Sequence, residues 1–222
     1  MGLKADFIAL LKTGTVSQIK FKIGTIRVYG DGFKTIADRC IAKKHIQIVQ
    51  SATWPPRLAL YNRKLNCLVI GPGVPANNLL VHEATHMLND WHKRRVNGIE
   101  DEVSAHVARA MYMLLARGWL RNRAMRNRIA AADRIIGQQC RALPKNNTCR
   151  VATVNAAAMV AIEFLEGRTP STAMLNRVRA AVRRWPVYVA TGIANPRNYD
   201  GIRHVNLPAA ELAKIRGTLI TS

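Results

Sequence analysis

Residues 79–90 read Leu-Leu-Val-His-Glu-Ala-Thr-His-Met-Leu-Asn-Asp, and this stretch decides how the middle of the chain folds. The apolar run at 65–70 predicts a buried strand before it, and the glycines and prolines of 71–75 end that strand. Apolar residues then recur at helical spacing over 77–92, and the histidines and acids fall on the opposite side. We therefore expect a helix with an apolar back against a sheet and a polar front toward a cleft.

His82 and His86 are four residues apart, so they share one face of this helix, about one turn from each other. Their imidazoles can converge on a single metal ion. Glu83 is not needed as a ligand, and it is placed to take a proton from a metal-bound water, whose pKa the metal lowers toward about 7. Two ordinary surface histidines are the alternative, because a bare H-E-x-x-H pattern is only moderately specific. The strand and turn before the motif favour the metal site.

A zinc ion bound for catalysis needs a third protein ligand and an open fourth position. Glu102, on a helix predicted at 99–117, is the best-placed candidate, followed by Glu100 and Asp101. His92 competes with these acids, and neighbouring ligands or none at all remain as alternatives.

His92 completes the longer pattern H-E-x-x-H-x-x-N-x-x-H, which resembles the metzincin signature. Metzincins have glycine where Asn89 stands, and that glycine lets the helix stop so that the third histidine reaches the metal. They also need a methionine turn, whereas Met111 lies in a predicted continuous helix. Both departures favour Glu102 over His92.

The runs 79–90 and 102–112 (Glu-Val-Ser-Ala-His-Val-Ala-Arg-Ala-Met-Tyr) resemble glutamate-zincin metallopeptidase domains, most closely the toxin or effector modules of bacterial secretion and polymorphic-toxin systems. The similarity covers about residues 40–115, and His106 stands where many such domains have an aromatic residue. The resemblance implies a Zn²⁺ cofactor and a protein or peptide substrate. It is also compatible with an acidic immunity or inhibitor protein as a partner. It implies that His82, His86 and Glu102 are the metal ligands and that Glu83 is the general base. Residues that could stabilise an oxyanion across the cleft are His106, Tyr112, Tyr199 and His204.

The distribution of elements predicts an α+β, zincin-like fold in a single domain spanning 1–222. A small N-terminal β-sheet packs on the helix of the H-E-x-x-H motif, and a mainly helical C-terminal half follows. A chain of 222 residues is long enough to bury a sizeable core. The predicted strands are 21–29, 45–49, 58–61 and 67–70, and the predicted helices are 1–12, 33–43, 77–92, 99–117, 119–138, 151–166, 171–185 and 208–217.

The formal net charge is +21, from 34 basic and 13 acidic residues. Basic residues concentrate at 109–150, where Asp133 is the one acid, and at 177–184. Such a field attracts polyanions, so a polyanion-binding protein with a structural metal site stays open as an alternative function. Because the H-E-x-x-H pair also serves other metal-dependent hydrolases, a cell-wall peptide amidase stays open as well. A solvated arginine-rich surface is the simplest interpretation of the charge.

The four cysteines form no C-x-x-C pattern, so a second, structural metal site is not expected. Cys140 and Cys149 bracket a polar loop, and a disulfide between them would suit an oxidising compartment. Cys40 and Cys67 lie among apolar residues and are expected to be core thiols. No signal peptide or apolar run of bilayer length is visible, and the localisation stays open. A mature domain is one alternative, and cytoplasmic synthesis followed by delivery as an effector to the periplasm or a target cell is another.

Overall fold

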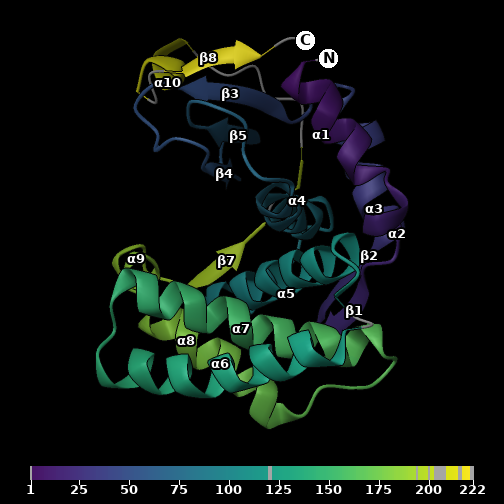
Figure 1. Ribbon diagram of the computed structural model, residues 1–222. Helices are drawn as coiled ribbons and strands as arrows, with labels where there is room; N and C mark the ends of the chain where they lie inside the picture. The colour runs from purple at the N-terminus through teal and green to yellow at the C-terminus, as the bar shows by residue number, and fades with distance from the viewer. Residues whose placement is uncertain are drawn as a thin grey trace. The chain divides into compact units, whose positions relative to one another are not determined.

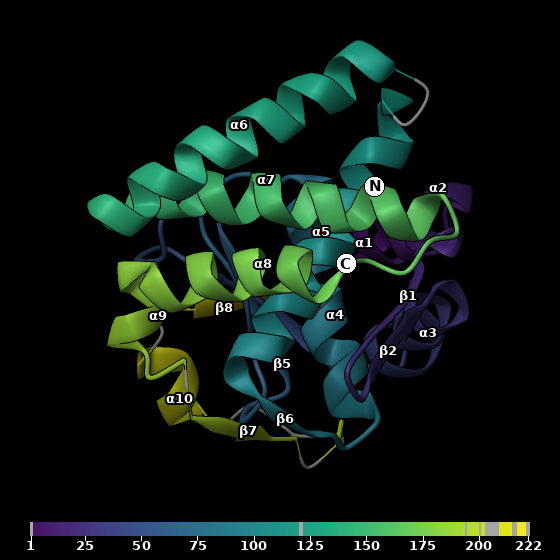
Figure 2. The same cartoon turned by 90° about the horizontal axis from the view of Figure 1, so that it is seen from below.

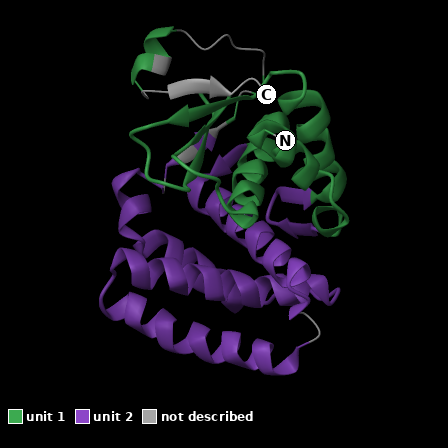
Figure 3. Ribbon diagram, turned by 45° about the horizontal axis from the view of Figure 1, so that its top comes forward, with its two compact units in different colours: residues 1–18, 29–94, 199–222 green, residues 19–28, 95–198 purple. Residues whose placement is uncertain are grey.

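The computed structural model describes residues 2–119, 122–193, 195–199, 201–202, 209–214 and 217–220. It has the predicted α+β composition, with small sheets in the N-terminal part and a mainly helical C-terminal half (Figure 1). The chain divides into two compact units, described separately below (Figure 3). Unit 1 comprises residues 1–18, 29–94 and 199–222, and unit 2 comprises residues 19–28 and 95–198. The single domain over 1–222 stays a prediction.

Unit 1 contains a four-stranded sheet with the strand order β4-β5-β3-β8. β5 runs antiparallel to β4 and parallel to β3, and β8 is antiparallel to β3. All four residues of β5 are buried, which explains its uninterrupted apolar sequence. The strands are β3 (Gln47–Ser51), β4 (Ala59–Asn62), β5 (Cys67–Ile70) and β8 (Gly217–Ile220).

The helix that carries the H-E-x-x-H motif, α4 (Asn77–Trp91), packs against β4 in unit 1. Its N-cap is Ala76, which makes no side-chain cap hydrogen bond. Every residue of α4 from Leu80 to Asp90 is buried, so the expected polar front is enclosed rather than open. The other helical segments of unit 1 are α1 (Leu3–Leu11), α2 (Gly14–Ser17), α3 (Gly30–Thr35), the π-helical η1 (Ile36–Ile41) and α10 (Ala209–Lys214).

Unit 2 is built mainly from long helices, and α7 contacts α5, α6 and α8. Figure 2 shows α6, α7 and α8 running side by side. Asn97, Asn122 and Ser171 cap the N-termini of α5, α6 and α8 by accepting backbone N–H bonds. The helices are α5 (Gly98–Ala116), α6 (Arg123–Ala142), α7 (Asn146–Leu165), α8 (Thr172–Arg184) and α9 (Pro186–Ala190), and the strand pairs are β1 (Lys20–Ile23) with β2 (Ile26–Tyr29) and β6 (Arg95–Asn97) with β7 (Pro196–Asn198).

Among the described residues, α7 is the one helix long and apolar enough to cross a membrane, judged by length and composition alone. The expectation that no apolar run reaches bilayer length therefore does not hold on this criterion. Half of the most apolar window of α7 is buried, and α7 packs against three helices of its own unit. A core helix meets the same criterion, and this packing is typical of a core helix.

The structure contains the disulfide that the sequence left open, and the other two cysteines are the expected core thiols. A disulfide joins Cys140, near the end of α6, to Cys149, near the start of α7. Cys40 and Cys67 are free and fully buried. Burial raises the pKa of each of these two thiols from 9.0 to about 12, and at Cys40 the negative charge of Asp90 adds to the effect.

Candidate metal centre

The two histidines of α4 face each other. The Nε2 atoms of His82 and His86 are 3.2 Å apart, and the rings meet edge to face with centroids 4.9 Å apart. Both side chains are almost fully buried. Two nitrogens about 2.0–2.1 Å from one tetrahedral zinc ion would be about 3.3–3.4 Å apart, so the pair fits a shared zinc ion.

Glu83 lies directly beside this pair. Its Oε2 accepts a hydrogen bond of 2.7 Å from the backbone N–H of Tyr61, and its Oε1 is 4.0 Å from Nε2 of His82. The donor is accessible because β4 is the last strand of its sheet among the described residues, where its outer backbone groups have no strand partner. One carboxylate oxygen is therefore held by the sheet while the other faces the histidines.

Tyr61 makes a second connection to α4. Its hydroxyl donates to Oδ2 of Asp90 at 2.6 Å, and Oδ1 of Asp90 accepts the backbone N–H of Gly201 at 3.0 Å. Asp90 is fully buried and lies one turn after His86. Burial, followed by the charge and hydrogen bond of Asp90, raises the pKa of the Tyr61 phenol far above its ordinary value, so the phenol remains a donor.

Within unit 2, an arginine from β7 holds Glu102 and its neighbour. Arg197 donates from Nη1 to Oδ2 of Asp101 at 2.6 Å, and its Nη2 is 3.0 Å from Oε1 of Glu102. The start of α5 lies close to the segment before β7, because a Cβ at Gly98 would be 2.3 Å from the carbonyl oxygen of Ile193. Only glycine permits this approach, and it brings α5 within reach of the arginine on β7.

His106 lies one turn after Glu102 on α5 and is also buried. Its Nε2 is 2.9 Å from the hydroxyl of Tyr188, and its ring lies 5.8 Å from that of Trp185. Because Nε2 faces Tyr188, any ligand role of His106 would fall to Nδ1. Trp185 and Tyr188, at the beginning of α9, thus hold this imidazole.

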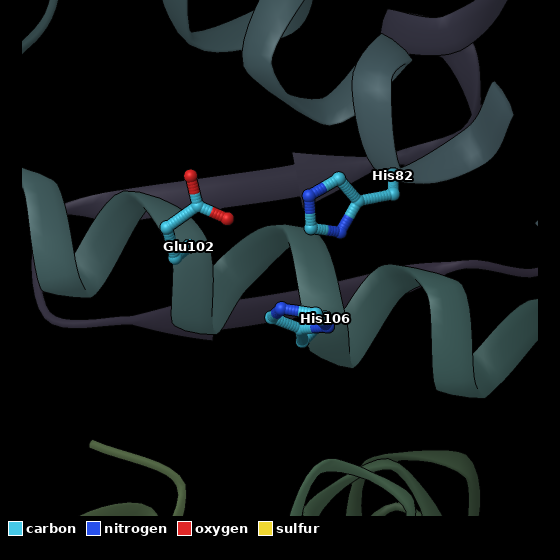
Figure 4. Close-up of side chains that lie close together, drawn as sticks. All are labelled: His82, Glu102 and His106. Carbon is cyan, nitrogen blue, oxygen red and sulfur yellow. The ribbon is translucent and has the colours of Figure 1, made fainter. Parts of the chain in front are cut away.

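Three of these buried residues, His82, Glu102 and His106, form a group that could hold a metal ion (Figure 4). Each offers one ligand atom, and these atoms all lie within 4.8 Å of one another. The group contains two of the predicted ligands and adds His106, which the sequence suggested only as an oxyanion candidate. Imidazole and carboxylate ligands suit zinc and other divalent transition metals, so the ligands alone leave the identity of the ion open.

The other candidate third ligands also have partners, and Asp101 shares its partner Arg197 with Glu102. Glu100 forms a two-pronged ion pair with Arg179, with distances of 2.6 and 3.1 Å, and Asp101 pairs with Arg197. His92, the C-cap of α4, hydrogen bonds to the hydroxyl of Tyr29 at 3.1 Å. Burial and the nearby positive charge of Arg94 lower the pKa of His92.

The remaining oxyanion candidates receive less support. Tyr199 is buried in unit 1, where the Arg63 guanidinium lies 5.5 Å from its ring centroid. Tyr112 is half-buried on α5, and His204 lies outside the described residues. His106 is thus the member of this set that lies among candidate ligands.

Comparison with known proteins gives no family assignment. No protein-family model, no curated protein and no solved structure matches the chain. The functional argument therefore depends on the residues themselves.

Proposed function

We propose that this protein is a zinc-dependent metallopeptidase in which His82, His86 and Glu102 hold the metal and Glu83 is the general base. The observation that carries the proposal is the convergent histidine pair with a carboxylate oxygen fixed beside it. The resemblance to glutamate-zincin effector domains points the same way. It also suggests delivery as a toxin or effector and an acidic inhibitor protein as a partner.

When bound, a zinc ion supplies Lewis acidity that polarises a peptide carbonyl and acidifies water. The protein residues carry out the proton transfers. Glu83 accepts the proton of the attacking water and then passes it to the nitrogen of the leaving amine, so the carboxylate is regenerated in each cycle. The Tyr61 N–H keeps the other carboxylate oxygen of Glu83 engaged, which restricts rotation of the base away from the histidines.

The role of His106 distinguishes a catalytic metal site from a structural one. A catalytic zinc site has three protein ligands and an open position, whereas a structural site is closed by four. We assign His106 and Tyr188 to the substrate side, where their hydrogen-bonded pair can donate to a developing oxyanion. If His106 instead joins the other three ligands, the protein is a binding module with a structural metal, which is the second candidate function and is favoured by the grouping of His106 with His82 and Glu102.

Metal content and peptide cleavage test the proposal together. We expect about one zinc per chain in the wild type and in Glu83→Gln, and loss of zinc in His82→Ala. Cleavage of a peptide library by Glu83→Gln should fall about 10²–10⁴-fold, because the proton acceptor is gone while the ligands remain. The same assay with cell-wall peptides tests the amidase alternative.

Two histidine variants sharpen this result. His92→Ala is the matched control and should retain both zinc and cleavage, since His92 bonds to Tyr29 in unit 1. His106→Gln should retain zinc while cleavage falls. Loss of zinc in His106→Gln together with no cleavage by the wild type would establish the structural site and refute the peptidase.

A further inference from the structure

A cavity of about 150 Å³ lies wholly within unit 2, among α6, α7 and α8. It contains none of the candidate metal ligands. Arginine side chains, one acid and several small residues line it: Arg134, Arg141, Arg177 and Arg184; Asp133; and Gly137, Cys140, Ala152, Ala156, Ala180 and Ala181. The cavity therefore combines a strongly basic lining with an apolar floor.

The arginines come in two pairs. Arg134 and Arg141 are two turns apart on α6, and Arg177 and Arg184 are two turns apart on α8, so each pair shares a helical face. Arg177 forms an ion pair of 2.9 Å with the buried Asp133. Within the described part of the chain, the other three arginines form no ion pair with a carboxylate. Three positive charges of the lining thus remain for a ligand.

The uncharged residues that line the cavity are small, so their side chains leave its volume empty. Gly137 lies in the middle of α6, where glycine weakens a helix relative to alanine. A Cβ at Gly137 would meet nothing within 4 Å, so close packing does not require glycine there. The buried Ala152 and Ala156 of α7 line the same space, and the Cys140–Cys149 disulfide links α6 to α7 beside it.

We propose that this cavity binds a small organophosphate, with a compact apolar body on the small-residue floor and the phosphate held by the arginines. An apolar cavity of about 150 Å³ accommodates a group of about the size of benzene. Guanidinium groups match phosphate oxygens through paired N–H donors. The three unpaired arginines favour a dianionic phosphate monoester over a singly charged carboxylate. A soluble monoester and a monoester lipid headgroup offer the same chemistry.

Calorimetric titration with phenyl phosphate tests the assignment. Phenyl phosphate should bind the wild type at least tenfold more tightly than inorganic phosphate or benzyl alcohol. Inorganic phosphate lacks the apolar body, and benzyl alcohol lacks the phosphate. Gly137→Leu, which fills the cavity, should weaken binding more than tenfold. Arg141→Gln should weaken it about fivefold, because one charged hydrogen-bond donor at an exposed position is lost.

Matched controls separate the cavity from general surface charge. Arg128→Gln removes an exposed arginine of α6 that does not line the cavity, and it should leave the affinity unchanged. His82→Ala should also bind phenyl phosphate normally, so failure of the proposed peptidase function would leave this result intact. Equal affinities for phenyl phosphate and inorganic phosphate, or equal losses in Arg128→Gln and Arg141→Gln, would overturn the proposal.

Two further measurements complete the test. Circular dichroism and an intact disulfide check the fold of Gly137→Leu, and Arg141→Gln alone decides the outcome if that variant is unfolded. Vesicles containing phosphatidic acid distinguish the two sources of the ligand. Displacement of phenyl phosphate by the vesicles indicates a lipid headgroup, and no displacement indicates a soluble monoester.

Discussion

At the scale of single residues, Tyr61 connects the sheet of unit 1 to two acids of α4. Its backbone N–H bonds to Glu83, and its hydroxyl bonds to the fully buried Asp90. Only the second bond depends on the side chain. A buried carboxylate that loses a donor retains much of its desolvation cost, so the hydroxyl has a larger effect on stability than an exposed one would have.

Tyr61→Phe should therefore lower the free energy of unfolding by about 2 kcal/mol, measured by urea denaturation. The effect is partial because Gly201 still donates to Asp90. Tyr112→Phe is the matched control, since the half-buried Tyr112 has no hydrogen bond among the described residues, and it should change stability by less than about 0.5 kcal/mol. Equal effects of the two substitutions would contradict the role given to the Tyr61 hydroxyl.

The buried thiols predict both a reactivity and a pH dependence. With pKa values of about 12, Cys40 and Cys67 should not react with a thiol reagent at pH 8 unless the protein unfolds. Their folded pKa values lie above the unfolded value, so their contribution to stability is complete below about pH 9. It is lost as the pH rises from about 9 to 12, because the unfolded chain releases protons that the folded chain retains. Rapid labelling of either thiol at pH 8 would show that the thiols are accessible.

At the scale of elements, the Cys140–Cys149 disulfide closes a short loop between α6 and α7, with a sequence separation of 9. In the chain-entropy account, a loop of that size stabilises the fold by about 3 kcal/mol. The double variant Cys140→Ala/Cys149→Ala should unfold at correspondingly lower urea concentration than the oxidised wild type. Reduction of the wild type should lower the urea midpoint by the same amount. An unchanged midpoint on reduction would contradict the stabilising role given to the disulfide.

The long helices could be predicted from the sequence because their apolar spacing is sustained over several turns. The prediction was wrong where a single turn residue or a distant strand partner decides the structure. The single strand predicted at 21–29 is instead the β1–β2 hairpin, since Gly24 has a φ of +57° that turns the chain. The helix predicted at 208–217 covers α10 (Ala209–Lys214) but misses β8, whose partner β3 lies some 170 residues earlier along the chain. No local pattern reveals such a pairing.

The candidate site shows the same division between local and distant information. The meeting of His82 and His86 could be predicted because their spacing places them on one face of α4, whereas the orientation of Glu83 depends on Tyr61 of β4. His106 has the same i, i+4 relation to Glu102, and that spacing was the available signal for grouping the two residues. The pairing of Glu100 with Arg179 and of Asp101 with Arg197 could not be predicted, because each arginine lies on a distant element.

At the scale of the whole molecule, the peptidase proposal does not account for the net charge of +21. Much of the charge lies on unit 2, where α6 and α8 carry exposed arginines. Some of it is neutralised locally, as in the contacts of Arg126 with Glu166 and of Arg168 with Glu163 and Glu166. The remaining charge predicts association with polyanions that depends on phosphate contacts and carries no sequence information.

Fluorescence anisotropy with a short DNA duplex checks this prediction. If about six phosphates are contacted, affinity should fall about 10³-fold between 50 and 200 mM salt, because the entropy gained by releasing condensed counterions is smaller at higher salt. Replacing the exposed Arg123, Arg128 and Arg183 by glutamine should reduce the slope of log K against log salt by about three, one for each lost contact. Scrambling the duplex sequence should change nothing. Binding that persists at high salt and depends on sequence would make nucleic-acid recognition the primary function, since a surface field alone discriminates by charge and not by base.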